Sequence, residues 1–95
     1  MLRQAQKMQE DMANLQAELD AKEYDVSAGG GMVQVKINGK REILSIEVNP
    51  DIVDPDDVEM LTDLVMTAVN DALRQCEETT SREMQKLTGG MNLGF

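Results

Sequence analysis

The sequence contains no histidine and no tryptophan, and it has only one phenylalanine, one tyrosine and one cysteine. Without histidine it lacks the commonest general base and metal ligand. The single cysteine, Cys76, excludes an intrachain disulfide. Aromatic side chains bury the largest area per residue, so a monomer of 95 residues with so few of them has little large apolar side-chain material for its core. Eight methionines supply flexible apolar filler instead, which favours burial between chains.

Basic residues and long apolar runs are also scarce. Nine Lys and Arg stand against eighteen Asp and Glu, which gives a net charge of −9. This balance argues against a nucleic-acid footprint over the whole surface and against a polybasic membrane patch. No apolar run approaches the ~18–20 residues of a membrane span. The polar N-terminus does not resemble a signal peptide, so the reducing cytoplasm is the expected location.

No group of residues indicates catalysis or the binding of a metal or cofactor. Cys76 lies on an apolar helical stripe, a pattern typical of a small core residue. The aspartates at 51, 54, 56 and 57 lack the spacing of a calcium loop, and helix capping explains them better. Residues 29–31 are three glycines, but no Lys-Ser/Thr follows them, so they indicate a turn rather than a phosphate loop. We therefore expect no enzymatic activity, no cofactor and no small-molecule substrate.

Two stretches, residues 1–23 and 56–87, contain neither glycine nor proline, as long helices require. The first has a narrow, heptad-like apolar stripe, typical of a coiled-coil seam: Ala5, Met8, Met12, Leu15 and Leu19. The second has Asp54 as a candidate N-cap and Pro55 at the first helical position. It is expected to reach Leu87 and to close at Thr88-Gly89-Gly90. Its widest apolar face contains Val58, Leu61, Val65, Ala68, Ala72 and Cys76.

The middle of the chain predicts three short strands, at residues 24–28, 32–38 and 42–48. Residues 32–38 alternate, with Val33, Val35 and Ile37 on one face. Asn38-Gly39 predicts a two-residue hairpin turn, because both central residues of that turn need positive φ. Such a turn pairs Val33 with Leu44 and brings the apolar faces of both strands together.

The predicted fold is α+β: a helix, three short antiparallel strands and a long helix, in one domain over residues 1–88, with a flexible Gly/Met/Asn tail at 89–95. Both helices meet the sheet at one end, so their distal ends can project from it together. Residues 51–73 hold seven acids and no base, whereas residues 1–9 hold Arg3 and Lys7 and no acid. Basic residues therefore gather near the helix tips, although from charge alone ordinary solvated helix faces are the better explanation. Three strands leave two free edges, and pairing of one edge with a second copy predicts a homodimer.

Residues 27–40, Ser-Ala-Gly-Gly-Gly-Met-Val-Gln-Val-Lys-Ile-Asn-Gly-Lys, resemble the signature of the YbaB/EbfC family of bacterial nucleoid-associated proteins. Residues 4–9, 54–61 and 87–92 resemble its first helix, the start of its second helix and its closing motif, in the same order. Family members usually carry a Gly/Met/Asn-rich leader, whereas this sequence starts at the helix.

The resemblance implies a cytoplasmic, nucleoid-associated homodimer that binds double-stranded DNA through helices projecting like tweezers from a shared β platform. Its role would be in nucleoid organisation or the regulation of gene expression. Mapped onto this chain, the DNA-binding residues are Arg3, Gln6, Lys7, Arg74, Arg82 and Lys86. The alternative is a holdase-like chaperone or protein-interaction module, favoured by methionines near the tips at 1, 8, 84 and 91.

Overall fold

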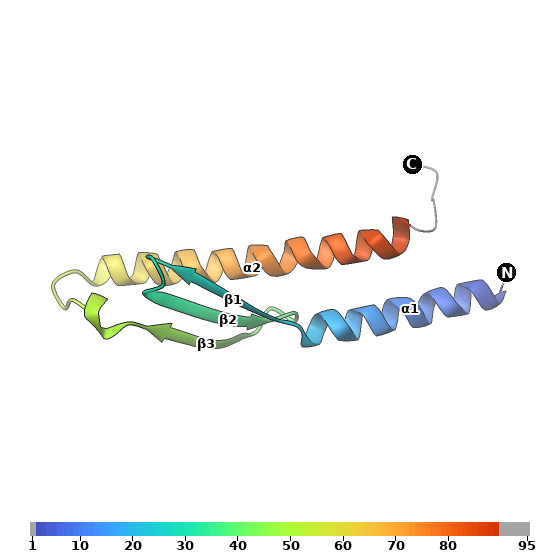
Figure 1. Ribbon diagram of the computed structural model, residues 1–95, viewed down its shortest axis with the longest axis horizontal. Helices are drawn as coiled ribbons and strands as arrows, with labels where there is room; N and C mark the ends of the chain where they lie inside the picture. The colour runs from blue at the N-terminus through green and yellow to red at the C-terminus, as the bar shows by residue number, and fades with distance from the viewer. Residues whose placement is uncertain (1, 90–95) are drawn as a thin grey trace.

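The computed structural model describes residues 2–89 as two helices and a three-stranded sheet (Figure 1). The predicted α+β architecture is confirmed, and the strands are antiparallel in the order β1-β2-β3. In chain order the elements are α1 (Leu2–Ala21), β1 (Glu23–Ala28), β2 (Val33–Asn38), β3 (Ile43–Val48), the 3-10 helix η1 (Pro50–Ile52) and α2 (Val58–Gly89).

The core lies between β2 and the middle of α2, as the apolar patterns predict. Val33, Val35 and Ile37 of β2 are almost completely buried. They pack against small, buried side chains spaced four residues apart on α2: Ala68, Ala72 and Cys76. Because these side chains are small, the helix lies close to the sheet. Each buried Val or Ile contributes about 1.5–3 kcal/mol through the removal of apolar surface from water.

The hairpin between β2 and β3 forms, but the predicted two-residue turn is wrong. The Asn38 amide donates to the Glu42 carbonyl (3.1 Å), and the Arg41 amide donates to the Asn38 carbonyl (3.1 Å), so residues 39–41 form the loop. Positive φ occurs at Arg41 (65°) and not at Gly39. A three-residue loop of this kind ends in a left-handed residue, here Arg41. Because the loop is longer than predicted and is placed further along the chain, β3 pairs with β2 at other positions than predicted.

The register of β2 and β3 therefore differs from the prediction. Val33 pairs with Val48 rather than with Leu44, and a register irregularity lies between Lys36 and Ile37. From Val33 to Lys36 the shift is by four residues, an even number, so the alternation of faces survives there; beyond the irregularity Ile37 pairs with Ile43. The apolar faces of the two strands still coincide.

The predicted N-cap of α2 is also wrong. Asp54 begins a backbone turn in which the Asp57 amide donates to the Asp54 carbonyl (3.0 Å), with Pro55 at the second position. Asp57 is the N-cap, because its Oδ1 accepts from the amide of Met60 (3.2 Å) and the helix begins at Val58. The Asp-Pro signal thus forms a turn before the helix.

At its other end α2 continues to Gly89, past Leu87 where the sequence predicts its end. The predicted cap and the tail at 89–95 fall mostly beyond the residues that the structure describes.

Helix α2 covers β1 and β2 and leaves β3 uncovered (Figure 1). A helix is about 10 Å wide and strands lie about 4.8 Å apart, so one helix spans two strands. Val35 is 1% exposed, whereas its partner Ile46 on β3 is 45% exposed. Ile43 and Leu44 are exposed to 40% and 46%. An apolar strip on β3 is therefore open in the single chain.

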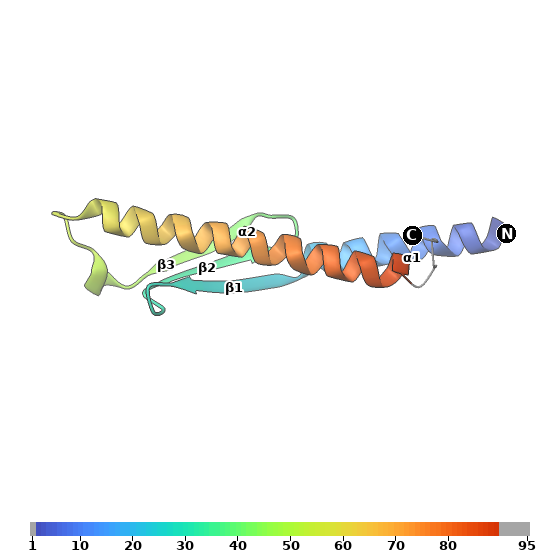
Figure 2. The ribbon, with the colours of Figure 1, turned by 90° about the horizontal axis from the view of Figure 1, so that it is seen from above.

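The molecule is elongated, with extents of 65 × 25 × 16 Å. Helix α1 leaves the sheet on the same side as the C-terminal half of α2, and the two helices run onward in the same general direction (Figures 1 and 2). This arrangement confirms the prediction that both distal ends project together. We call α1 and the C-terminal half of α2 the arms.

Candidate nucleic-acid interface

The first arm is anchored at its C-terminal end. Leu19 is 4% exposed, whereas most of the α1 surface towards the tip is open. Only Lys22 separates α1 from β1, and its amide donates to the Leu19 carbonyl (3.2 Å). The direction of the arm is therefore set by a short joint and by the packing around Leu19.

The turn between β2 and β3 contacts both arms where they leave the sheet. A Cβ atom placed on Gly39 would lie 1.6 Å from the Leu19 carbonyl oxygen. The Cys76 Sγ lies 3.7 and 3.6 Å from the carbonyl oxygens of Asn38 and Gly39, within the range of weak S–H···O contacts. This turn occupies the base of the arms, and glycine is required at 39 by this close approach.

Tyr24 fills the same region from β1. Its side chain is buried, and among residues 2–89 its hydroxyl has no hydrogen-bond partner within range. Burial raises the pKa of the Tyr24 phenol above 10.0, and Cys76 and Glu83 raise it further. The nearby Thr79 side chain lowers the pKa of Tyr24, but no hydrogen bond to the Tyr24 hydroxyl is formed. The Lys22 ammonium lies over the ring, 5.7 Å from its centroid.

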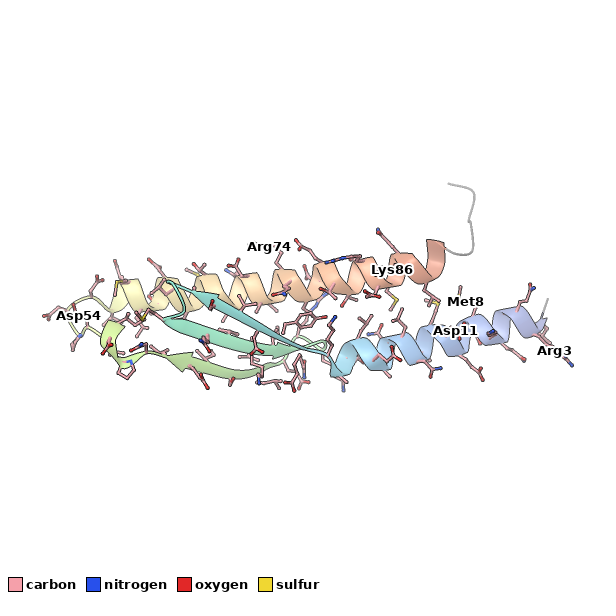
Figure 3. The ribbon with its side chains drawn as sticks, viewed as in Figure 1. Arg3, Met8, Asp11, Asp54, Arg74 and Lys86 are labelled. Atoms are coloured by element: carbon pink, nitrogen blue, oxygen red, sulfur yellow. The ribbon has the colours of Figure 1, made fainter. Side chains whose placement is uncertain are left out.

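Basic residues lie at the tips of the arms, and a cluster of acids without bases lies at the other end of the molecule. Arg3 lies at the free end of α1 and Lys86 near the end of α2, whereas Asp54 lies at the far end beyond the sheet (Figure 3). The acids of η1 and of the start of α2 are thus separated from the arm tips by the length of the sheet, whereas Asp71 lies in the middle of α2 beside Arg74. This separation allows a locally basic surface on a chain whose net charge is −9.

The basic residues singled out from sequence fall into two groups. Arg3, Lys7 and Arg82 form no ion pair with any of residues 2–89. By contrast, Arg74 is paired with Asp71 (3.1 Å), and Lys86 is paired with Glu83 (3.3 Å).

Arg74 also differs in position. It lies on the side of α2 that faces away from the sheet (Figure 3). Gln6 and Lys7 are exposed on α1, three and four residues from Arg3, so each lies on the same helical face as Arg3.

Three cations that the sequence analysis did not single out lie at the base of the arms. Lys22 joins α1 to β1, and Lys40 and Arg41 belong to the turn. Lys40 lines a shallow depression with Asp20 of α1. The adjacent Lys40-Arg41 pair was visible in the sequence, but only the fold brings it next to both helices.

Part of the inner surface of the first arm is apolar. Met8 points from α1 into the space beside α2 (Figure 3), and it lines an open groove of about 360 Å³ with Gln4, Lys7 and Asp11. Met8 is half-buried, whereas Met12 is 38% exposed. The predicted seam is therefore only partly covered.

Neither described helix is long and apolar enough to cross a membrane. Within the same part of the chain, no three His, Cys, Asp or Glu side chains converge in a way that could hold a metal ion.

The fold and its arms define a class: a small α+β protein with two projecting helices that carry cations at their tips. The match to the YbaB/EbfC DNA-binding family covers residues 1–91. A nucleoid-associated protein of Alkaliphilus metalliredigens is 58% identical over 98% of this chain and 82% of its own length. One from Clostridium novyi is 59% identical over the same shares. The chain therefore belongs to the YbaB/EbfC DNA-binding family.

A solved structure supports the fold independently. An uncharacterized protein from Helicobacter pylori superposes with a TM-score of 0.76 over 88% of each chain, at 23% sequence identity. This likeness concerns the arrangement of helices and strands alone.

Proposed function

We propose that this protein acts as a homodimer that binds double-stranded DNA in the cytoplasm, at the nucleoid, and organises the nucleoid or regulates gene expression. It acts by binding and not by catalysis. The observation that carries this proposal is the set of unpaired cations on the arms, Arg3, Lys7 and Arg82, in a chain of a DNA-binding family.

The arms offer a surface for DNA because they are long and exposed, and because residues 1–9 hold Arg3 and Lys7 and no acid. Cations on two helices that project to the same side neutralise backbone phosphates without the sequence-reading contacts of a groove-binding helix. The six proposed contacts are Arg3, Gln6, Lys7, Arg74, Arg82 and Lys86. We rank the unpaired cations first, because an existing ion pair with a nearby acid competes with a phosphate.

The uncovered strip on β3 supports the dimer. It combines a free strand edge with the exposed apolar side chains of Ile43, Leu44 and Ile46. Exposed edges and apolar patches of this kind are normally covered in native proteins. A second copy that presents the same strip would cover both the free strand edge and the apolar side chains through a symmetric contact.

The surface area of the chain agrees with a missing partner. It exposes 6936 Å² at a mass of 10.5 kDa, whereas a compact monomer of this mass exposes roughly 5,400 Å². The difference is larger than the roughly 800 Å² that each partner buries in a standard interface. The projecting arms contribute to this excess, and the β3 strip contributes as well.

The experiment that tests the proposal is a titration of labelled duplex DNA with the purified protein, by fluorescence anisotropy, at several salt concentrations. With about six phosphates neutralised per dimer, the logarithm of the binding constant should fall against the logarithm of salt with a slope of about −5. Absence of binding at low salt would contradict the DNA-binding proposal. Binding without salt dependence would contradict the proposed contacts with phosphates.

The holdase-like alternative rests on the apolar groove beside Met8 and on the exposed Met12. Replacing Arg3, Lys7, Arg82 and Lys86 with Ala separates the two functions. If DNA is the ligand, this variant loses DNA binding. If the arms hold apolar clients, the variant still suppresses aggregation of a model client such as reduced insulin, and so does the wild type.

A further inference from the structure

The turn at the base of the arms holds an arginine in a conformation that favours glycine. Arg41 has φ of 65°, and it is the single non-glycine residue with positive φ within residues 2–89. In a three-residue hairpin loop the left-handed position is normally taken by glycine, because a Cβ atom there is strained. With arginine at this position, the folded protein is therefore less stable than it would be with glycine.

Local contacts of the Arg41 side chain do not account for this choice. Its guanidinium forms one ion pair, with Glu77 of α2 at 3.4 Å. The two side chains are 59% and 55% exposed, and such exposed pairs contribute little to stability. Lys40, next to it, is exposed and forms no ion pair with the described residues.

The turn that carries these two cations is held firmly. The Asn38 Oδ1 accepts from the amides of Lys40 (2.9 Å) and Glu42 (3.0 Å), and the Asn38 Nδ2 donates to the Glu42 carboxylate (3.0 Å). Gly39 abuts Leu19 of α1 from the same loop. Two charges are thus presented at a fixed place where both arms begin.

We propose that Lys40 and Arg41 form a second phosphate-binding site, which contacts the DNA backbone at the base of the arms. This inference rests on the proposed DNA-binding function and adds a contact that lies away from the tips. A duplex held along the arms meets cations at both ends of its track, at the tips and at this turn. Functional placement of a cation explains why the strained position is not glycine.

The test is Arg41→Gly, because its two expected effects have opposite signs. The urea midpoint of unfolding should rise, since glycine relieves the strained φ. The affinity for duplex DNA at low salt should fall about fivefold, and the salt slope should shrink by about two per dimer, because one phosphate contact is lost from each subunit.

Two controls separate this contact from general charge effects. Lys36→Gln removes one positive charge from the opposite face of the sheet and should leave the salt slope unchanged. Glu77→Gln frees Arg41 from its ion pair, and Glu78→Gln removes the same charge from a neighbouring exposed position. Because the Glu77 carboxylate competes with a phosphate for Arg41, DNA binding by Glu77→Gln should exceed that of Glu78→Gln.

The measurements distinguish failure of this second site from failure of the proposed DNA-binding function. If the wild-type protein does not bind DNA, the proposed function fails. If the wild type binds with a salt slope and Arg41→Gly keeps both its affinity and its slope, this second site is wrong while the arm contacts stand. A loss of stability and affinity in Arg41→Gly that Glu77→Gln reproduces would assign Arg41 to its ion pair and overturn the proposal.

Discussion

Gly39 and Leu19, twenty residues apart in the sequence, meet so closely that no side chain fits between them. A Cβ atom on Gly39 would stand 1.6 Å from the Leu19 carbonyl oxygen and 2.9 Å from the Asp20 Cα. The obstacle is backbone rather than the end of a flexible side chain, so it cannot move without moving α1. This contact fixes the first arm against the sheet.

We therefore expect Gly39→Ala to destabilise the protein by at least about 2 kcal/mol, because the new methyl group forces helix and turn apart. Urea unfolding followed by circular dichroism measures the change. Gly30→Ala is a matched control, since nothing lies within 4 Å of a Cβ atom there and only the positive φ of 68° is strained. That control should cost about 1 kcal/mol. Equal effects in the two variants would contradict the role of the Gly39–Leu19 contact.

The arm cations should differ in their contribution to DNA binding. Arg82 and Arg74 are the same residue type on the same helix, but only Arg74 is paired with an acid in the described chain. Arg82 lies about 12 Å further towards the tip. We expect Arg82→Ala to weaken binding to duplex DNA about fivefold at low salt, and Arg74→Ala to change it less than about twofold. Anisotropy titrations of both variants decide this, and a larger loss in Arg74→Ala would contradict the ranking.

The β3 strip should be the surface that joins two copies. Ile46→Lys places a charge in this strip, where an ammonium that is buried and unpaired in the dimer is strongly unfavourable. Light scattering after size-exclusion chromatography should give about twice 10.5 kDa for the wild type and 10.5 kDa for the variant.

Met66→Lys is the matched control for this interface. Met66 is 56% exposed and lies two residues from the buried Ala68, so it faces away from the sheet. It should remain dimeric. A dimeric Ile46→Lys would place the interface elsewhere, and a monomeric wild type would remove the dimer.

Much of the fold could be predicted from the sequence because periodic patterns carry it. The buried Val33, Val35 and Ile37 follow from strict alternation, and Ala68, Ala72 and Cys76 follow from helical spacing. These patterns indicate which face of each element is buried, and the burial of apolar surface is the dominant favourable contribution to the free energy of folding.

The errors arose where several turns share one sequence signal. Asn38-Gly39 suits a two-residue turn, yet the close approach to Leu19 requires Gly39 for a different reason, and the left-handed residue of the loop is Arg41. Asp54-Pro55 suits both a helix start and a turn. The exposure of β3 and the cations at the base of the arms depend on long-range packing, which no local pattern records.

The buried hydroxyl of Tyr24 gives the last prediction. Within the described chain it has no hydrogen-bond partner, and an unsatisfied buried polar group costs about 1–3 kcal/mol. Tyr24→Phe removes that group and keeps the ring, so we expect the free energy of unfolding to rise by about 1 kcal/mol near neutral pH. Chemical denaturation of both proteins measures this difference, and a variant less stable than the wild type would indicate that the hydroxyl is satisfied.

The pH dependence of the stability of the wild type and of Tyr24→Phe tests whether burial of the phenol is the cause. Burial raises the pKa of the Tyr24 phenol above its ordinary value of 10.0, so the folded state favours the neutral form. Stability from this preference is complete below pH 10 and is lost as the pH rises through the raised pKa. Phenylalanine does not titrate. The stability advantage of Tyr24→Phe should therefore widen between about pH 8 and about pH 11, whereas a constant difference would mean that the phenolate is tolerated at this site.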